Sequence, residues 1–109
     1  MTGSRIQVVT TTDSEQAAAT LARSIIDARL GACVQVSTIR SFYRWDDTVR
    51  DDPEWRLEIK TTAAVLDRLI AHIRENHSYD VPEVIATPII GGNPGYLSWL
   101  DDETSGLVP

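Results

Sequence analysis

The segment from Cys33 to Thr61 constrains the fold most, because it predicts one β-hairpin that is very long for a chain of 109 residues. Residues Cys33–Trp45 are rich in β-branched and aromatic types, which favour pleated strands. The return arm, Glu54–Thr61, alternates apolar and charged residues, a pattern typical of a half-buried strand. We expect residues 46–53, DDTVRDDP, to form the turn, because Pro53 is disfavoured inside a central strand.

The length of this hairpin predicts association with other chains. A strand of the length of Cys33–Trp45 spans roughly 43 Å at about 3.3 Å per residue, whereas a compact chain of this size has a radius of gyration of about 13 Å. The far end should therefore project beyond the domain, and it carries Phe42, Tyr43, Trp45 and Trp55. Exposed aromatic side chains on a strand edge favour aggregation unless something covers them. We expect an obligate homo-oligomer that buries these residues.

Size and charge exclude several classes of protein. The chain should be one domain, residues 1–109, with an ordered core at about 6–101 and a polar C-terminal tail from Glu103. A net charge of −6 argues against nucleic acid and anionic membranes as partners. The single cysteine excludes a disulfide framework within the chain. No signal peptide or membrane-spanning run is recognisable, so we expect a cytoplasmic protein.

The remaining pattern predicts two further strands and three helices. Their expected bounds are a strand at Ile6–Thr11, a helix from a capping box at Thr12–Glu15 to a terminal Gly31, a helix between a Thr62 cap and Asn76, an edge strand at Val84–Ile90, and a short helix from Asn93 to about Leu100. The resulting order is β-α-β-β-α-β plus a terminal helix. This order predicts an α+β, ferredoxin-like fold with helices on one face of an antiparallel sheet.

The loop HSYDVPE is the strongest candidate for a site. His77, Tyr79, Asp80 and Glu83 could ligate a borderline metal or bind a small polar ligand. A loop whose polar groups only satisfy one another is an equally good interpretation. Cys33 fits a small buried hydrophobe better than a reactive thiol or soft-metal ligand.

Other polar residues favour structural roles. The aspartates that bracket the predicted turn fit a solvated, aggregation-resisting tip better than a cation site. His72 fits the surface of the second helix better than a ligand position. The GGNP segment fits a structural turn better than an anion site. No Ser–His–Asp set or nucleophile elbow is recognisable.

Five segments in order indicate a family. LGACVQV, SFYRW, EWRLEIKT, HSYDVPE and GGNPGYLSWL, spread over about Val8 to Leu100, give the chain a close resemblance to the CutA family of divalent-cation-tolerance proteins. The resemblance implies a ferredoxin-like fold similar to that of the PII signalling proteins. It also implies a homotrimer whose hairpins pair across subunits, and tolerance of copper and other divalent ions.

The resemblance also transfers individual positions. The residues that match the family pattern are Cys33, Tyr43, Trp45, Lys60, His77, Tyr79, Pro82, Glu83, Asn93, Tyr96 and Trp99. The chain departs from the relatives proposed to bind copper at Thr10, where they have Cys, at Asn76, where they have His, and at Ser78, where they have Pro. His77 alone of the three proposed copper ligands is retained.

Three functions follow, in descending order of expectation. The first is a non-enzymatic trimer that binds Cu(II) or another divalent cation through His77, Glu83, Tyr79 and Cys33, with Trp99 joining the hairpin aromatics at the trimer interface. The second is a PII-like signalling module that binds a small metabolite or a partner protein at a subunit cleft near Lys60, His77, Tyr79 and Glu83. The third is an enzyme with His77 as general base.

Overall fold

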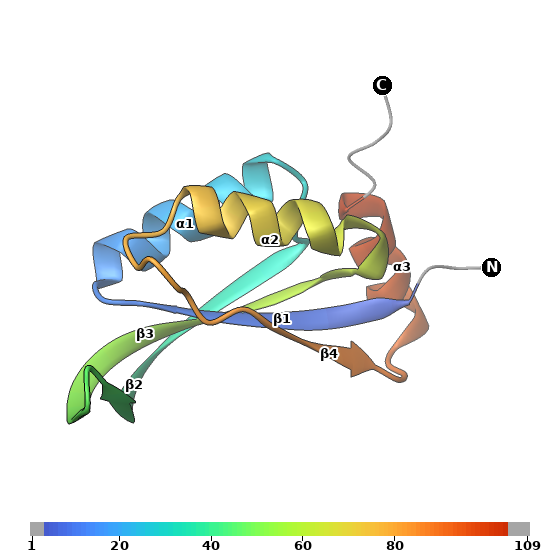
Figure 1. Ribbon diagram of the computed structural model, residues 1–109. Coiled ribbons are helices and arrows are strands. Elements are labelled where there is room, and N and C mark those ends of the chain that lie inside the picture. The colour runs from blue at the N-terminus through green and yellow to red at the C-terminus, as the bar shows by residue number, and fades with distance from the viewer. Residues whose placement is uncertain (1–3, 105–109) are drawn as a thin grey trace.

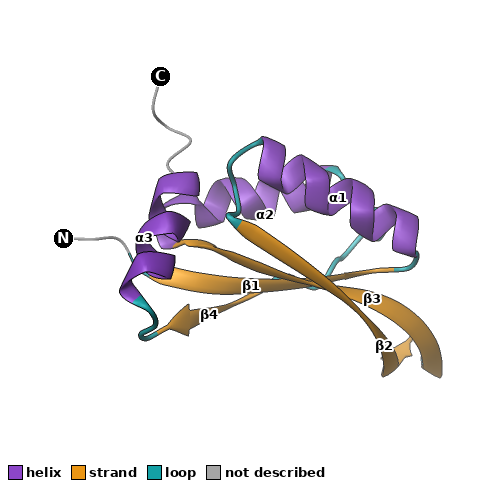
Figure 2. Ribbon diagram, turned by 180° about the vertical axis from the view of Figure 1, so that it is seen from behind, coloured by secondary structure: helices purple, strands orange, loops and turns teal. Residues whose placement is uncertain are grey.

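The computed structural model describes residues 4–104 and shows an α+β fold with a four-stranded antiparallel sheet in the order β2-β3-β1-β4 (Figure 1). Helices α1 and α2 lie side by side on one face of the sheet, and α3 lies at one end (Figure 2). The predicted fold class and ferredoxin-like order are confirmed. The elements are β1 (Arg5–Thr12), α1 (Glu15–Asp27), β2 (Cys33–Trp45), β3 (Thr48–Thr62), the 3₁₀ turn η1 (Ala63–Val65), α2 (Leu66–Glu75), β4 (Ile85–Ile89) and α3 (Pro94–Glu103).

The core lies between the sheet and the two helices. It forms because alternate strand residues and one stripe of each helix point into the same layer. In the described residues, the buried members of this cluster are Ile6, Val8, Ala18, Leu21, Ile25, Leu30, Leu57, Ile59, Val65, Leu69 and Ile73. One stripe of each helix therefore packs on the sheet.

The hairpin turn is much tighter than predicted. Asp46 and Asp47 form it alone, with φ of 51° and 59°, and Trp45 pairs directly with Thr48. The left-handed conformation of both residues is that of the two-residue turns whose twist matches the strands. The prediction of an eight-residue turn was wrong, because the local turn preferences of Pro and Asp do not report which residues pair across the strands.

Pro53 lies inside β3, opposite Arg40. Strand β1 ends at Thr12, which pairs with Trp55, and so does not reach Pro53. In the described structure β2 is therefore the one strand beside β3 at this position, and a proline is tolerated there as it is on an edge strand. Two of the aspartates predicted at the tip are strand residues with partners. Asp51 accepts hydrogen bonds of 2.8 and 2.7 Å from the guanidinium of Arg40, which lowers the pKa of that carboxyl.

The start of α1 also corrects the prediction. Ser14, rather than Thr12, caps the helix, and its Oγ accepts a hydrogen bond of 3.0 Å from the N–H of Ala17. Thr12 instead donates a hydrogen bond of 3.0 Å to the carbonyl of Ser14. The longer β1 carries Thr12 into the sheet, which leaves the cap to the next serine.

The end of α1 shows a different use of glycine from the predicted one. Arg29, after the C-cap Ala28, takes the left-handed φ of 57°. Gly31 has no positive φ; its role is close packing, because a Cβ there would lie 2.7 Å from Cγ2 of Ile59 and 3.0 Å from Cγ2 of Ile25.

The later boundaries are close to those predicted. Thr62 precedes η1 without a side-chain cap hydrogen bond, whereas Asn76 ends α2 as expected. Pro88 lies in the edge strand β4, which confirms its predicted position. Helix α3 is longer than predicted: Glu103 is helical, and Thr104 is buried. Residues 105–109 of the predicted polar tail lie outside the described residues.

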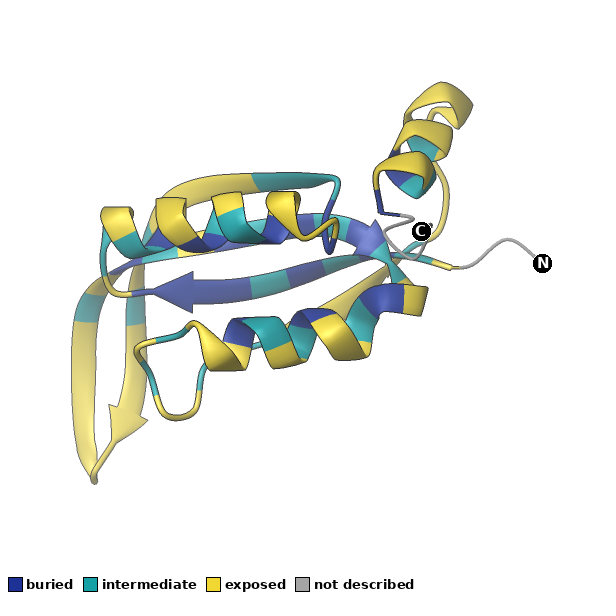
Figure 3. Ribbon diagram, turned by 90° about the horizontal axis from the view of Figure 1, so that it is seen from above, coloured by how far each residue is buried: buried dark blue, intermediate teal, exposed yellow. Residues whose placement is uncertain are grey.

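The hairpin projects from the domain, as its length predicts. The principal extents are 46 × 28 × 20 Å, and the radius of gyration is 14.6 Å. Figure 3 shows the far end of the hairpin exposed, in contrast to the buried centre of the sheet. Phe42 and Trp45 are 64% and 52% exposed. None of the helices in residues 4–104 has the length and apolar character that a membrane span requires.

Candidate functional site

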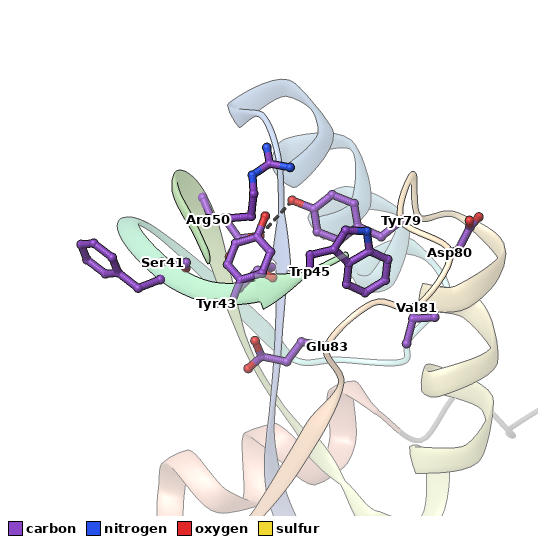
Figure 4. Close-up of a pocket in the computed structure, with 11 residues that line it drawn as sticks. Ser41, Tyr43, Trp45, Arg50, Tyr79, Asp80, Val81 and Glu83 are labelled. Carbon is purple, nitrogen blue, oxygen red and sulfur yellow. Dashed lines mark hydrogen bonds between the residues drawn. The ribbon is translucent and has the colours of Figure 1, made fainter. Parts of the chain in front are cut away.

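A cavity of about 580 Å³ lies where the projecting hairpin meets the loop between α2 and β4 (Figure 4). We call it the hairpin pocket. Its lining comes from the end of β1, both arms of the hairpin and the loop. The lining residues are Thr11, Ser41, Phe42, Tyr43, Trp45, Arg50, Glu54, Tyr79, Asp80, Val81 and Glu83.

His77 anchors the loop to the sheet. Its Nε2 lies 2.6 Å from the carbonyl oxygen of Thr11, and its Nδ1 accepts a hydrogen bond of 3.0 Å from the N–H of Tyr79. The carbonyl can only accept, so Nε2 carries the proton. The ring also lies 4.8 Å from that of Tyr79. Both ring nitrogens are therefore engaged, and in this arrangement His77 positions the loop and has no lone pair available to a metal.

Tyr79 turns into the pocket and contacts β3. Its hydroxyl donates a hydrogen bond of 2.8 Å to Oε2 of Glu54, which is 8% exposed. Burial, followed by the contact with this carboxylate, raises the pKa of Tyr79 far above its ordinary value. The phenol therefore stays protonated and satisfies the buried carboxylate.

A second phenol–carboxylate pair lies on the hairpin. Tyr43 donates a hydrogen bond of 2.6 Å to Oδ2 of Asp52, and this bond is the main cause of the raised pKa of Tyr43. The same carboxylate oxygen lies 3.5 Å from Nη2 of Arg50. Both phenols that line the pocket thus direct their protons to carboxylates of β3.

Cys33 and Lys60 lie at the other end of the sheet. Cys33 pairs with Lys60 across β2 and β3. Thr11, at the hairpin pocket, pairs with Arg56 of β3. Arg56 and Lys60 are four residues apart along β3, which is a distance of about 13 Å. Lys60 hydrogen-bonds to Gln35. Burial and the nearby Cys33 thiol raise the pKa of Tyr96 on α3. The structure brings Tyr79 and Glu83 to one cavity with His77 beside them, but it does not bring Cys33 or Lys60 there.

The predicted interface aromatics divide into three groups. Phe42, Tyr43 and Trp45 lie on the projecting part of the hairpin. Trp55 is half-buried and packs against the core of its own chain. Trp99 lies on α3 with its ring 5.4 Å from that of Tyr96.

No sequence pattern marks Glu54 as a site residue. Glu54 lies at the start of the alternating arm, where its charge looks like an ordinary solvent-facing residue. The register that pairs it with Ile39, together with the fold of the distant loop, places it beneath Tyr79. No local sequence pattern predicts that contact, because Glu54 and Tyr79 are 25 residues apart in the chain. Within residues 4–104, no three His, Cys, Asp or Glu side chains converge in a way that could hold a metal ion.

A serine–histidine pair links α1 and α2, and it too was not predicted. Nε2 of His72 lies 2.8 Å from Oγ of Ser24. Because Oγ donates its single proton to the carbonyl of Leu21 at 2.8 Å, it must accept from His72. This direction is the reverse of that in a nucleophile activated by a general base.

Comparison with known proteins gives a consistent result. Residues 6–103 match the family model described as CutA1 divalent ion tolerance protein. The chain is 49% identical to Protein CutA 1, chloroplastic, of Oryza sativa subsp. japonica over 100 residues, which are 91% of this chain and 56% of that protein. It is 41% identical to the divalent-cation tolerance protein CutA of Thermus thermophilus over 98 residues, covering 89% of this chain and 95% of that protein.

Solved structures agree with these sequence matches. The crystal structure of CutA1 from Oryza sativa has a TM-score of 0.91 at 47% identity, covering 94% of this chain and 95% of that one. The structure of the Thermus thermophilus protein has a TM-score of 0.89 at 38% identity, with 93% and 99% covered. The chain spans about half the length of the curated plant relatives, 56% for rice and 55% for Arabidopsis thaliana. The protein described here belongs to the CutA1 divalent ion tolerance family, as the sequence motifs predicted.

Proposed function

We propose that this protein acts in tolerance of divalent cations as a homotrimer, without enzymatic activity. Support for the cation role comes from the family and from the hairpin pocket, where the carboxylates of Glu54, Asp80 and Glu83 and the phenol of Tyr79 line one cavity. Carboxylate oxygens are ligands that suit divalent cations, including Cu(II) when a nitrogen donor completes the set.

The trimer is supported by the projecting hairpin. Its far end exposes Phe42, Trp45 and Val49, and β2 is an edge strand with one neighbour in the described sheet. An exposed aromatic edge of this length is normally covered by another chain. Light scattering should give three times the mass of the chain at micromolar concentration. A monomer mass would contradict the trimer and the covering of the hairpin.

The metal site is proposed to need a second copy or a rearrangement of His77, because one chain's described residues bring no three strong ligands together. Cys33 would contribute only from a neighbouring copy, since it lies far from the pocket of its own chain. Equilibrium dialysis with Cu(II) and Zn(II) tests the site. We expect Glu83→Gln and His77→Ala to reduce bound metal, whereas the control variants Glu75→Gln and His72→Ala, on α2, should not. Equal metal binding by all variants would contradict a site at the pocket.

The absence of enzymatic activity is supported by the proton arrangement at both histidines. His77 uses both nitrogens to hold the loop, and His72 donates to Ser24. Neither histidine is therefore placed to act as the general base of an enzyme. Turnover of any substrate that is lost in His77→Ala, with the fold intact, would contradict this part of the proposal.

A second candidate function is a PII-like module that binds a small organic ligand. The observation that favours it is the hairpin pocket itself, whose volume of about 580 Å³ and aromatic lining fit a metabolite. It predicts ligand-dependent thermal stabilisation that persists in the presence of a chelator. Stabilisation by metal ions alone would contradict it.

The compartment is proposed to be the cytoplasm, where a free Cys33 stays reduced. The relatives' names include chloroplastic forms, and one solved structure is described as that of a periplasmic protein from Archaeoglobus fulgidus. Fractionation of the source cells tests the proposal; recovery of the protein in an organelle or the periplasm would contradict it.

A further inference from the structure

We propose that the hairpin pocket binds an organic ammonium ion of metabolite size. The inference rests on the second function proposed above, small-ligand binding at this pocket, and it specifies the chemical class of the ligand. Three features carry it: aromatic walls, phenols that are already committed as donors, and an excess of carboxylate.

The aromatic walls come from two parts of the chain. Tyr43 and Trp45 come from β2, and Tyr79 comes from the loop before β4. Figure 4 shows their rings grouped together, with Glu83 beside them. The negative face of an aromatic ring attracts a cation within about 6 Å of the ring centre, and several rings around one volume bind weakly hydrated ammonium groups. A cavity of about 580 Å³ is large enough for such a group and its substituent.

The two phenols do not offer protons to an anion. Tyr79 donates to Glu54 at 2.8 Å, and Tyr43 donates to Asp52 at 2.6 Å. A phenol that donates to a carboxylate has a more electron-rich ring, which strengthens its attraction for a cation. An anionic ligand would have to break one of these bonds to gain a donor.

The charges at the pocket favour a cation. The lining contains the carboxylates of Glu54, Asp80 and Glu83 and the single guanidinium of Arg50, which lies 3.5 Å from Asp52 and is paired with it. Among the described residues, the carboxylate of Glu83 makes no ion pair, which leaves it to balance the charge of a ligand.

A bare metal ion fits the walls less well than an organic cation does. Hard cations such as Ca²⁺ require about six to eight oxygen ligands, and in the described structure no three acidic, His or Cys side chains converge. Both nitrogens of the nearby His77 are engaged. Aromatic faces cannot replace oxygen ligands, whereas they do replace the loose hydration shell of an alkylammonium ion.

Titration with choline, followed by ligand-observed NMR with a chelator present, tests the proposal on the intact assembly. Neohexanol, the uncharged carbon isostere of choline, is the matched probe. We expect choline to bind and neohexanol to bind at least about tenfold more weakly. Trp45→Leu keeps apolar bulk but removes the indole, and Glu83→Gln keeps shape but removes the charge. Each should weaken choline binding by about twofold to thirtyfold.

The controls lie outside the pocket. Trp99→Leu on α3 and Glu75→Gln on α2 should bind choline as the wild type does. Because Trp45 and Trp99 are both proposed at the trimer interface, light scattering accompanies each variant. Glu83→Gln tests the pocket if Trp45→Leu alters assembly, and Glu75→Gln remains as the control if Trp99→Leu does so. Equal binding of choline and neohexanol, or wild-type affinity in both pocket variants, would overturn the proposal.

A parallel titration with citrate separates this proposal from the function on which it rests. Citrate binding that is lost in Arg50→Gln, with no choline binding, would overturn the ammonium class and retain small-ligand binding. If neither choline nor citrate bound, both proposals would fail.

Discussion

The hydroxyl of Tyr79 and the carboxylate of Glu54, 25 residues apart in the chain, are joined by a hydrogen bond of 2.8 Å. This bond ties the loop after α2 to the point where β3 leaves the domain and becomes the projecting hairpin. It satisfies a carboxylate that is 8% exposed. The site therefore depends on a contact between two segments that have no local relationship.

Removal of this donor should destabilise the protein. Tyr79→Phe leaves the buried carboxylate of Glu54 without its phenolic partner, and we expect the free energy of unfolding to fall by about 1–3 kcal/mol. Urea unfolding at a fixed protein concentration measures the change. Tyr43→Phe is the control, since its partner Asp52 lies on the exposed hairpin, and its effect should be smaller. Equal effects of the two variants would contradict a special role for the buried pair.

The same tyrosine should make stability depend on alkaline pH. The pKa of Tyr79 is raised above its ordinary value of 10.0 in the folded state, so the unfolded chain releases this proton at lower pH than the folded chain. The stabilisation is complete below about pH 10 and is lost progressively as the pH rises from there toward the raised pKa.

Urea unfolding from about pH 8 to about pH 12 measures this dependence. The free energy of unfolding should fall less steeply with rising pH in Tyr79→Phe than in the wild type. Part of the fall should remain in the variant, because the pKa values of Tyr43 and Tyr96 are also raised. Identical pH profiles for the variant and the wild type would contradict this prediction, because they would mean that the pKa of Tyr79 is the same in the folded and unfolded states.

Thr10 offers a stabilising substitution. Its Oγ1 is buried and has no hydrogen-bond partner among the described residues. Thr10→Val replaces the hydroxyl by a methyl group of similar shape, and we expect it to raise the free energy of unfolding by about 1 kcal/mol.

Thr61→Val is the matched control for Thr10→Val. Thr61 is equally buried, but its Oγ1 donates a hydrogen bond of 2.8 Å to the carbonyl of Leu30. Loss of that bond should lower stability by about 1 kcal/mol. Destabilisation by both variants to the same extent would mean that Thr10 has a partner in solution, such as a buried water.

Gly31 should tolerate no side chain. Gly31→Ala places a methyl group 2.7 Å from Cγ2 of Ile59 and 3.0 Å from Cγ2 of Ile25, both in the core. The core must then shift, at an expected cost of about 1–3 kcal/mol. In Gly91→Ala the new methyl group meets no atom within 4 Å, and stability should stay within about 0.5 kcal/mol of wild type. Thermal unfolding of the two variants compares them directly, and a harmless Gly31→Ala would contradict the close packing.

Local sequence patterns are enough to predict the order of the elements, the buried face of the return arm and the long hairpin. These depend on periodicity, and periodicity is a local property: the alternation of Leu57 and Ile59 with charged residues faces β3 toward the helices whatever lies around it. The five motifs identified the family for a similar reason, because each is a short local segment and their order along the chain can be read directly from the sequence.

Where two local signals conflicted, contacts between distant segments selected one of them. Pro53 looked like part of a turn, yet β1 is too short to reach it, so it remains in β3. Gly31 looked like a helix end, yet the approach of Ile59 is what requires it. His77 looked like a ligand, but Thr11 and Tyr79 engage both of its nitrogens. Glu54 gave no signal, and only the distant loop that brings Tyr79 over it makes it part of a site. Hydrogen bonds and close contacts between distant segments carry no periodicity, and for that reason only the folded chain could place them.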